Sequence, residues 1–304
     1  MCKRVQILMS VYNGEKYLSE QLDSLAAQTG CDISLLIRDD ASTDGSAGII
    51  RQYQEKYPWI VYYKGENKGA CGSFLDLSAH ADMDADYYAF CDQDDVWEPD
   101  KLKCAIEMLE QQPVRECLYC SPVKLVDAGL VPISDISQYP ALKASFGNAV
   151  VENICTGCTA VFSRELLLLI REKLPQHAYM HDWWLYLVAA CFGVVCYDTD
   201  SHILYRQHGN NTLGGQESFV SHLKRRMRNY GGMKHYVPEQ LAEFLQLYGG
   251  DISGENRKVL ETMLMPQKNP FSRCRIFRQK AVMRSRRMDD IIYKILFLFW
   301  RFGK

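Results

Sequence analysis

The sequence lacks any apolar run long enough to span a bilayer, and its first residues lack the apolar core of a signal peptide. It also lacks internal repeats and low-complexity tracts, and its net charge is only −2. The composition is that of an ordinary globular chain, which we expect to stay in the cytosol. Its 304 residues suit one large α/β domain, or one such domain with a helical appendage.

Two common phosphate-binding signatures are also absent. No G-x-G-x-x-G follows the first predicted strand, and no P-loop occurs in the chain. If the protein binds a pyrophosphate, the backbone amides of a glycine-rich loop do not hold it. A metal ion is then the natural counter-charge for such a group.

Cysteine is not scarce, since the chain has twelve, but its spacing indicates neither a disulfide framework nor a zinc ribbon. In a cytosolic chain we expect reduced cysteines that pack in the core. The two C-x-x-C pairs, Cys117/Cys120 and Cys155/Cys158, are too far apart for a zinc ribbon, and no histidine is usefully placed beside them. A structural zinc at these pairs is therefore disfavoured.

Short apolar segments alternate with helical patterns over the first hundred residues. Strands are predicted at 5–11, 33–37, 59–63 and 87–91, with a helix after each of the first three. This alternation predicts a parallel sheet of βαβ units with right-handed crossovers. Further along, we expect a strand at 118–126, an irregular loop at 129–149, helices at 163–174 (Ser163 as N-cap) and 183–190, and strands at 194–197 and 203–205.

Three carboxylates, Asp92, Asp94 and Asp95, directly follow the fourth predicted strand. Carboxylates this close repel one another unless a divalent cation and a bound phosphate share the charge. The carboxyl end of a strand is also where open α/β sheets bind ligands. The alternative is a plain turn, in which Asp94 or Asp95 caps the helix that begins near Pro99.

A second acidic turn, with Asp39 and Asp40, follows the second predicted strand. A nucleoside needs acceptors for its base N–H groups and ribose hydroxyls, and aspartate suits both. The alternative is helix capping by Ser42 or Thr43, with Gly45 in a turn.

Four motifs in register resemble those of family 2 glycosyltransferases, which have the α/β fold called GT-A. They are SVYNG (10–14), DDASTDG (39–45), NKG (67–69) and DQDDVW (92–97). More narrowly, DQDDVW together with YRQHGNN (205–211) is similar to the bacterial rhamnosyltransferase-like branch, whose members build cell-surface polysaccharide. The resemblance covers residues 4–212. It implies a GT-A domain at 1–215 and leaves a basic, mostly helical extension at 216–304. One departure is Ala41, where family members often have glycine.

The resemblance implies roles for the donor side of the site. Asp40 would accept hydrogen bonds from the base, and Asp92 would reach the ribose or the metal-bound diphosphate. Asp94 would be the principal ligand of a Mn²⁺ or Mg²⁺ ion shared with Asp92, and Asp95 would support the turn. The residues implied to line the nucleotide pocket are Val11, Tyr12 and Asn13, and those implied to face the phosphates are Arg206 or His208.

On the acceptor side, the resemblance implies that Asp182 is the catalytic base. Two adjacent tryptophans, Trp183 and Trp184, would raise the pKa of this carboxyl and could stack on a sugar. The alternative is that Asp182 caps a helix. The segment 153–159 resembles the family's acceptor side, where Gly157 would allow close approach of the backbone to the sugar.

These implications lead to an expected function: inverting, metal-dependent transfer of a sugar, plausibly rhamnose from dTDP-rhamnose, to a cell-surface glycan or lipid-linked glycan. The processive-synthase pattern Q-x-x-R-W is absent, which favours single additions. A sugar nucleotidyltransferase and a non-catalytic nucleotide- or glycan-binding subunit are the alternatives. No nucleic-acid partner is indicated.

Charge is uneven along the chain: residues 270–304 carry a net +8, and the remainder carries −10. Apolar segments at 291–293 and 295–300 flank Lys294 and together are too short to cross a bilayer. A basic amphipathic segment of this kind fits peripheral contact with the anionic inner face of the plasma membrane. The alternative is a C-terminal helix that packs on the domain.

Overall fold

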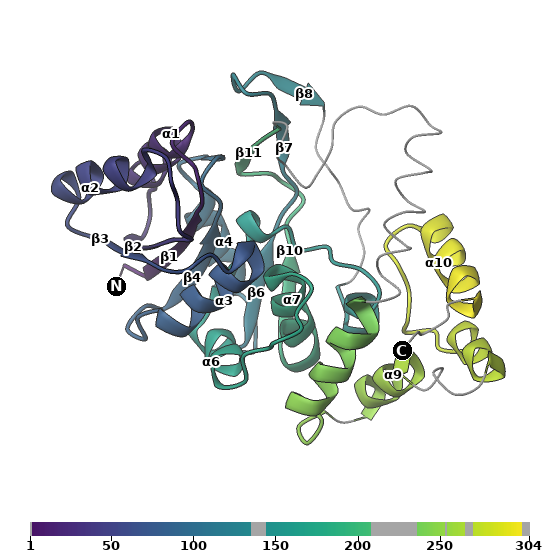
Figure 1. The fold of residues 1–304 in the computed structure, drawn as a ribbon. Coiled ribbons are helices and arrows are strands. Elements are labelled where there is room, and N and C mark those ends of the chain that lie inside the picture. Colours follow the sequence, from purple (N-terminus) through teal and green to yellow (C-terminus); the bar gives the residue numbers. More distant parts are fainter. Residues whose placement is uncertain (1, 135–143, 208–235, 253, 265–269, 300–304) are drawn as a thin grey trace. The chain divides into compact units, whose positions relative to one another are not determined.

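The computed structural model describes residues 2–134, 144–207, 236–252, 254–264 and 270–299, which build two units (Figure 1). The first unit comprises residues 1–138, 155–174 and 180–212, and the second comprises residues 139–154, 175–179 and 213–304. The second unit thus also takes in two short segments from before residue 215. The predicted division at that residue remains a prediction.

The first unit is built on a seven-stranded sheet with the order β10-β6-β9-β4-β1-β2-β3. Strands β3, β2, β1 and β4 run parallel, as the alternating pattern predicts, whereas β9 runs antiparallel to both its neighbours. The strands are β1 (Arg4–Val11), β2 (Asp32–Asp39), β3 (Ile60–Lys64), β4 (Tyr87–Cys91), β6 (Cys117–Cys120), β9 (Val161–Ser163) and β10 (Val194–Tyr197).

Helices cover both faces of this sheet, which explains why its strands are apolar throughout. On one face, Val5, Ile7 and Met9 of β1 belong to a core shared with helices α1 (Leu18–Ala26), α2 (Ser46–Lys56) and α4 (Lys101–Glu110). On the other face, Ser10 bonds to Ser73 of α3. This second layer contains helices α3 (Gly69–His80), α6 (Arg164–Glu172) and α7 (His181–Phe192), which contact one another.

A smaller four-stranded sheet corrects one prediction. Its order is β5-β11-β7-β8, with β5 (Val96–Trp97), β7 (Lys124–Val126), β8 (Pro132–Ser134) and β11 (Ile203–Arg206). The single strand predicted at 118–126 is wrong, because β6 and β7 belong to different sheets. Pro122 lies in the break, and proline has no N–H for a sheet ladder. The predicted irregular loop at 129–149 is also partly ordered, since it contains β8 and the short helix α5 (Phe146–Ala149).

The residues at which the helices begin show which of the predicted side chains act as helix caps. Ser163 Oγ accepts from Leu166 N–H, which confirms Ser163 as an N-cap. Asp100 precedes α4 and Gly45 precedes α2, so neither acidic turn caps its following helix as the alternatives supposed. Asp182 lies within the first turn of α7, after the N-cap residue Met180.

The second unit is helical. A helix covers 236–248, followed by α9 (Gly254–Leu264), the 3₁₀ segment η3 (Pro270–Phe277) and α10 (Arg287–Phe299). The buried Glu152 ties this unit together, because it accepts from Ser285 N–H at 2.6 Å and pairs with Arg284 at 3.1 Å. Among the described residues, no helix is both long and apolar enough to cross a membrane.

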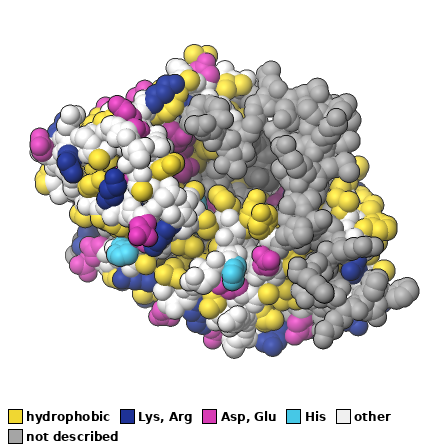
Figure 2. Space-filling model, in the orientation of Figure 1, with side chains coloured by type: hydrophobic (Ala, Val, Ile, Leu, Met, Phe, Trp, Pro, Cys, Tyr) yellow, Lys and Arg dark blue, Asp and Glu magenta, His cyan; other side chains and the backbone are white. Residues whose placement is uncertain are grey.

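Helix α10 has two apolar stripes with different surroundings. Tyr293 and Phe297 are buried, and Arg284 of the same unit lies over the Tyr293 ring. A second stripe faces solvent, and Figure 2 shows hydrophobic side chains gathered where α10 lies. Its members are Met288, Ile291, Ile295 and Phe299, which are 43–75% exposed.

Candidate active site

The loops that carry the acidic motifs meet at one edge of the seven-stranded sheet, where β1, β2 and β4 end (Figure 1). We call this the carboxyl edge. Strands β1 and β2 are paired as far as Val11 and Asp39, so their loops leave the sheet side by side. Parallel pairing thus gathers residues that are far apart in the sequence, as expected for an open α/β sheet.

The loops after β1 and β2 are joined by hydrogen bonds. Asn13 Oδ1 accepts from Thr43 N–H at 2.9 Å, and Ser42 Oγ accepts from Asn13 N–H at 3.0 Å. Asn13 has a φ of 49°, a left-handed conformation that asparagine tolerates. Of the predicted pocket residues, Tyr12 is half exposed, whereas the side chain of Val11 is buried in the core. Val11 can therefore shape the pocket only through its backbone.

Asp40, the predicted base acceptor, is almost fully buried and already accepts several hydrogen bonds. Its partners are the guanidinium of Arg38, Lys68 N–H at 2.8 Å and Gly69 N–H at 2.9 Å. Gly69 has a φ of +67°, which favours glycine at this position. The NKG motif is thus explained by the need to wrap a loop around the Asp40 carboxylate.

Gln93 joins the first loop to the loop after β4, a role that the sequence analysis did not predict. Its side chain accepts from Tyr12 N–H at 2.8 Å and donates to Tyr12 C=O at 3.0 Å. Gly14 lies so close to Gln93 that a β-carbon there would collide with the Gln93 amide. The position of Gln93 between two aspartates was the only sequence signal for this role.

The acidic turn, residues 92–95, concentrates negative charge at the carboxyl edge. Ligand atoms of Asp92, Asp95 and Cys158 lie within 4.8 Å of one another. Burial, together with the charges of Asp94 and Asp182, raises the pKa of Asp92 to about 7. Burial beside Asp92 and Asp94 likewise raises the pKa of Asp95 well above its ordinary value. A cation placed here would relieve this repulsion.

Asp95 fits this interpretation in one further respect. It is fully buried, and its Oδ2 accepts no hydrogen bond from any residue that the structure describes. Its Oδ1 accepts from Arg206 N–H at 3.2 Å. An orphaned carboxylate oxygen beside two further carboxylates is a donor set of the kind that Mg²⁺ and Mn²⁺ prefer.

Arg206 supports the acidic turn through hydrogen bonds to Asp94 and Asp95. Its Nε donates to Asp94 C=O at 2.9 Å, and its guanidinium pairs with Glu20 at 2.7 Å and lies over the Tyr17 ring. These contacts direct the side chain toward the protein, which differs from the predicted position facing the phosphates. His208, the other predicted phosphate contact, lies outside the described residues.

Asp182, the predicted base, is held near the acidic turn by the segment before β9. Its Oδ2 accepts from Gly157 N–H at 3.0 Å, and its Oδ1 accepts from Trp183 N–H at 2.7 Å. Cys158, the next residue after Gly157, is the one whose thiol lies beside Asp92 and Asp95. Asp182 is close enough to the acidic turn for its charge to contribute to the raised pKa of Asp92.

The residues around Asp182 are more buried than the sequence suggests. Trp183 and Trp184 are 5% and 0% exposed, so the suggestion that their rings stack on a sugar is wrong. His181 stacks on Phe74 with ring centroids 4.0 Å apart, and burial lowers its pKa to about 3. A β-carbon on Gly157 would lie 2.8 Å from His181 Nε2, so the glycine accommodates His181.

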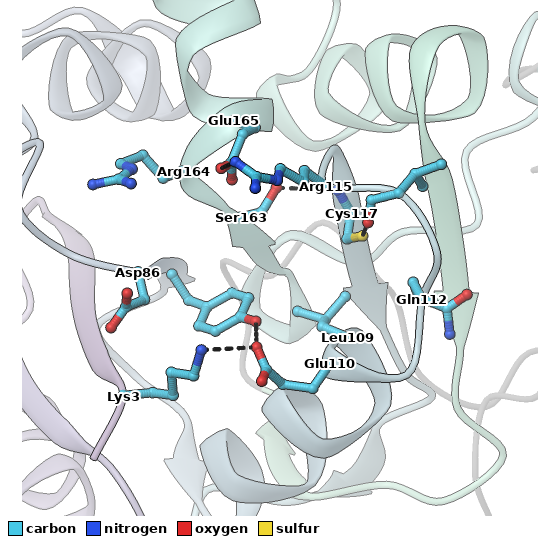
Figure 3. Close-up of a pocket in the computed structure, with 12 residues that line it drawn as sticks. Lys3, Asp86, Leu109, Glu110, Gln112, Arg115, Cys117, Ser163, Arg164 and Glu165 are labelled. Atoms are coloured by element: carbon cyan, nitrogen blue, oxygen red, sulfur yellow. Dashed lines mark hydrogen bonds and ion pairs between the residues drawn. The ribbon is translucent and has the colours of Figure 1, made fainter. Parts of the chain in front are cut away.

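A hollow lies at the opposite edge of the sheet, which we call the amino edge. It measures about 270 Å³ and is lined by charged side chains that pair with one another (Figure 3). Glu110 accepts from the Tyr87 hydroxyl at 2.5 Å and pairs with Lys3 at 3.0 Å. Arg115 and Glu165 also form a pair, at 3.9 Å. This hollow contains none of the predicted site residues.

Comparison with known proteins agrees with this arrangement. The model of the family described as Glycosyl transferase family 2 matches residues 6–169. The chain is 34% identical over 228 residues to the dTDP-rhamnosyl transferase RfbG of Shigella flexneri. The match covers 71% of this chain and 77% of that protein. It is 38% identical over 219 residues to an uncharacterized glycosyltransferase of Nostoc, covering 68% of this chain and 66% of that protein.

Solved structures show the same fold. S. aureus TarS in complex with UDP has a TM-score of 0.59 at 17% identity, over 91% of this chain and 75% of that one. The mannosyltransferase PcManGT of Pyrobaculum calidifontis, in complex with GDP-Man and Mn²⁺, has a TM-score of 0.54 at 17% identity, over 99% and 88%. With an acidic carboxyl edge, a matching family model and a relative at 34% identity, this chain belongs to glycosyl transferase family 2 and is a glycosyltransferase.

Proposed function

We propose that this chain transfers rhamnose from dTDP-rhamnose to a hydroxyl of a cell-surface glycan, with inversion at the anomeric carbon. The observation that carries the proposal is the proximity of Asp182 to the acidic turn at the carboxyl edge. One carboxylate on the acceptor side and a cation-binding group on the donor side are what an inverting transferase requires. The name of the Shigella relative supports rhamnose as the donor sugar.

For the donor, we propose that the first two loops bind the nucleoside. The backbone of Val11, the half-exposed Tyr12 and Asn13 would line it, and Asp40 would use its remaining acceptor capacity on the base. The hydrogen bonds between these loops and Gln93 fix their spacing before the donor binds. His208 stays a candidate for the phosphates. Arg206 would act indirectly, by positioning Asp94 and Asp95.

For the cofactor, we propose a Mn²⁺ or Mg²⁺ ion held by Asp94 and Asp92. The oxygen donors of the acidic turn, its mutual repulsion and the orphaned Asp95 Oδ2 all support a divalent cation. When bound, such an ion neutralises the charge that develops on the departing diphosphate. The complex of PcManGT with GDP-Man and Mn²⁺ is a precedent on the same fold.

For the base, we propose Asp182. Two backbone N–H groups, those of Gly157 and Trp183, fix its carboxylate, and 8% of the residue is exposed. It would take the proton of the acceptor hydroxyl while that oxygen attacks the anomeric carbon on the face opposite the departing diphosphate. Attack from that face inverts the configuration. The buried tryptophans behind Asp182 hold the start of α7 in place.

The test is a transfer assay on the purified full chain with a panel of nucleotide sugars, with Mn²⁺ or Mg²⁺ or with a chelator. We expect release of the nucleoside diphosphate from dTDP-rhamnose that depends on the metal. Product analysis by NMR should show the inverted linkage. Asp84→Asn, an exposed carboxylate in the loop before β4, is the matched control and should keep full activity. Equal activity with chelator, or a retained configuration, would contradict the proposal.

We also propose that the solvent-facing stripe of α10 contacts an anionic membrane, where lipid-linked acceptors are found. Lys294, which interrupts the apolar sequence, pairs with Asp290 at 2.8 Å. Arg275, Arg278, Arg286 and Arg287 are exposed in the same unit. An apolar stripe with nearby cations suits an anionic lipid surface.

Vesicle sedimentation tests the membrane proposal. The full chain should bind vesicles that contain phosphatidylglycerol but not vesicles of phosphatidylcholine alone, and added salt should weaken the binding. Replacing both Ile291 and Ile295 with serine should reduce binding. Leu168→Ser, a similarly exposed apolar residue of α6, is the control. Equal binding by the double variant and the wild type would exclude α10 as the contact.

A further inference from the structure

Three side chains with different donor atoms converge where α4 begins and where β11 begins. They are Asp100, Cys104 and His202, and one ligand atom from each lies within 4.8 Å of the other two. Asp100 directly precedes α4 and Cys104 is four residues later, so the two lie on one face of the helix start. His202 directly precedes β11. None of these residues belongs to the acidic turn or has a role in the proposed transfer.

The spacing of the donors suits a tetrahedral metal ion. His202 Nδ1 lies 3.2 Å from Asp100 Oδ1. With Zn–N and Zn–O bonds of about 2.0–2.1 Å, two ligands of a tetrahedral zinc ion lie about 3.3 Å apart. The His202 side chain is 13% exposed and Cys104 is partly buried, so the ring and the thiol are partly shielded from water.

The opposite side of the His202 ring has the partner that metal-bound histidines usually have. His202 Nε2 faces Asp198 Oδ2 at 3.6 Å, and the same oxygen accepts from the Tyr119 hydroxyl at 2.8 Å. A carboxylate behind the ring fixes the tautomer and the orientation of a metal-bound imidazole. Tyr119 in turn fixes this carboxylate. The Asp198 contact is independent of the three converging donors, and it leaves the ring nitrogen Nδ1 to be the ligand.

We propose that Asp100, Cys104 and His202 bind a single Zn²⁺ ion, with water in the fourth position and Asp198 as the outer partner of His202. A set with one thiolate, one imidazole and one carboxylate is typical of zinc. Burial, together with the negative charges of Asp100, Glu107 and Asp198, raises the pKa of the Cys104 thiol.

Such an ion would join two segments that support the active site. Helix α4 follows the acidic turn, and β11 ends at Arg206, which bonds to Asp94 and Asp95. The segments already share one backbone bond near the site, from Glu98 N–H to His202 C=O at 2.9 Å. The zinc ion would therefore hold these two segments together and stabilise the first unit, and it would not react with the substrate.

Titration of the metal-free full chain with Co²⁺ tests this proposal. A thiolate ligand gives Co²⁺ a charge-transfer absorption band in the near ultraviolet, and one equivalent of Zn²⁺ should abolish the band. We expect the band in the wild type and in Cys31→Ser, a matched control at another partly buried cysteine. We also expect it in Asp94→Ala, which removes the proposed catalytic metal ligand. The band should be absent in Cys104→Ser and in His202→Ala.

Affinity and stability give two further readouts. Asp198→Asn should weaken Zn²⁺ binding about 10–100-fold, as loss of an outer partner does elsewhere. Zn²⁺ should raise the thermal unfolding midpoint of the wild type but not that of Cys104→Ser. The proposal is overturned if no band forms, or if the band survives in Cys104→Ser and disappears in Cys158→Ser. Two ligand variants are used so that failure of one to fold leaves the test intact.

Discussion

The two edges of the seven-stranded sheet both carry many charged side chains, but they differ in how that charge is balanced. At the amino edge, Lys3 pairs with Glu110 and Arg115 pairs with Glu165 around the hollow described above (Figure 3). At the carboxyl edge, the carboxylates of Asp92, Asp94 and Asp95 are crowded into four consecutive residues, and the pKa values of Asp92 and Asp95 are raised. The hollow lined by paired charges thus lies at one edge, whereas the unbalanced charge lies at the other.

This contrast teaches that the balance of charge, and not the number of charged side chains, distinguishes the two edges. Paired charges need no ligand. Crowded carboxylates with raised pKa values are stabilised by a cation, and a nucleoside diphosphate brings one with it. If function depends on the carboxyl edge alone, substitutions there should change activity, and substitutions at the amino edge should not.

The largest expected effect is at Asp94. Asp94→Ala should lower the rate of transfer about 10³-fold, because a bound metal contributes several kcal/mol to stabilising the leaving group and each 1.4 kcal/mol is a factor of ten. The rate of nucleoside diphosphate release at saturating metal measures this. Glu110→Gln, at the amino edge, should remain within about twofold of the wild type. Equal losses in both variants would remove the distinction between the edges.

The next effect is at Asp182. Asp182→Asn keeps the shape of the side chain but cannot accept a proton, so kcat should fall about 10²–10⁴-fold. The KM for the donor should change little, because the donor-side loops are untouched. Steady-state kinetics with varied donor and fixed acceptor separates the two parameters. A variant with normal kcat would show that another group takes the proton.

A smaller effect concerns stability and pH. His181 is buried and uncharged, and its folded pKa of about 3 is below the ordinary value of about 6.5. The unfolded chain therefore binds more protons between these values, and stability is lost as pH falls below about 6.5. From pH 7 to pH 5 the loss should be about 2 kcal/mol from this residue. Denaturant unfolding at both pH values should show a smaller loss in His181→Phe than in the wild type.

The smallest effect is at Ala41, in the loop after β2. Its φ of 68° is a left-handed conformation that strains a residue with a β-carbon. Ala41→Gly should stabilise the protein by about 0.5–1 kcal/mol in urea unfolding, because relief of strain outweighs the added flexibility. Ala27→Gly is the matched control. Ala27 is exposed with a φ of −88°, so glycine there should destabilise slightly.

The sequence predicted the parallel core well because its strands are short, apolar and followed by turn residues. It also predicted which strands would end in acidic turns, and the pairing of β1 with β2 and β4 brings those turns to one edge. These features depend on local patterns and on the general rule for βαβ units. The N-cap at Ser163 was predicted for the same reason, since capping is local.

The errors lie where non-local contacts decide the outcome. Nothing in the sequence shows that β6 and β7 separate into two sheets, since both are apolar and only Pro122 marks the break. Arg206 was expected to face the phosphates, but its own burial against Tyr17 and its pairing with the exposed Glu20 are known only from the fold. Trp183 and Trp184 could serve equally in a sugar-binding surface or in the core, and only the fold shows that they are buried.

The reversed direction of β9 has a consequence for the position of Asp182. Because β9 runs opposite to β4, the segment that enters it, 157–159, lies at the edge where β4 ends, and Phe90 N–H bonds to Ala160 C=O there. A slip of two residues in this pairing would move Gly157 by about 6–7 Å and keep every side chain on its own face. Because Gly157 N–H bonds to Asp182, the register of β9 against β4 sets the distance of Asp182 from the end of β4.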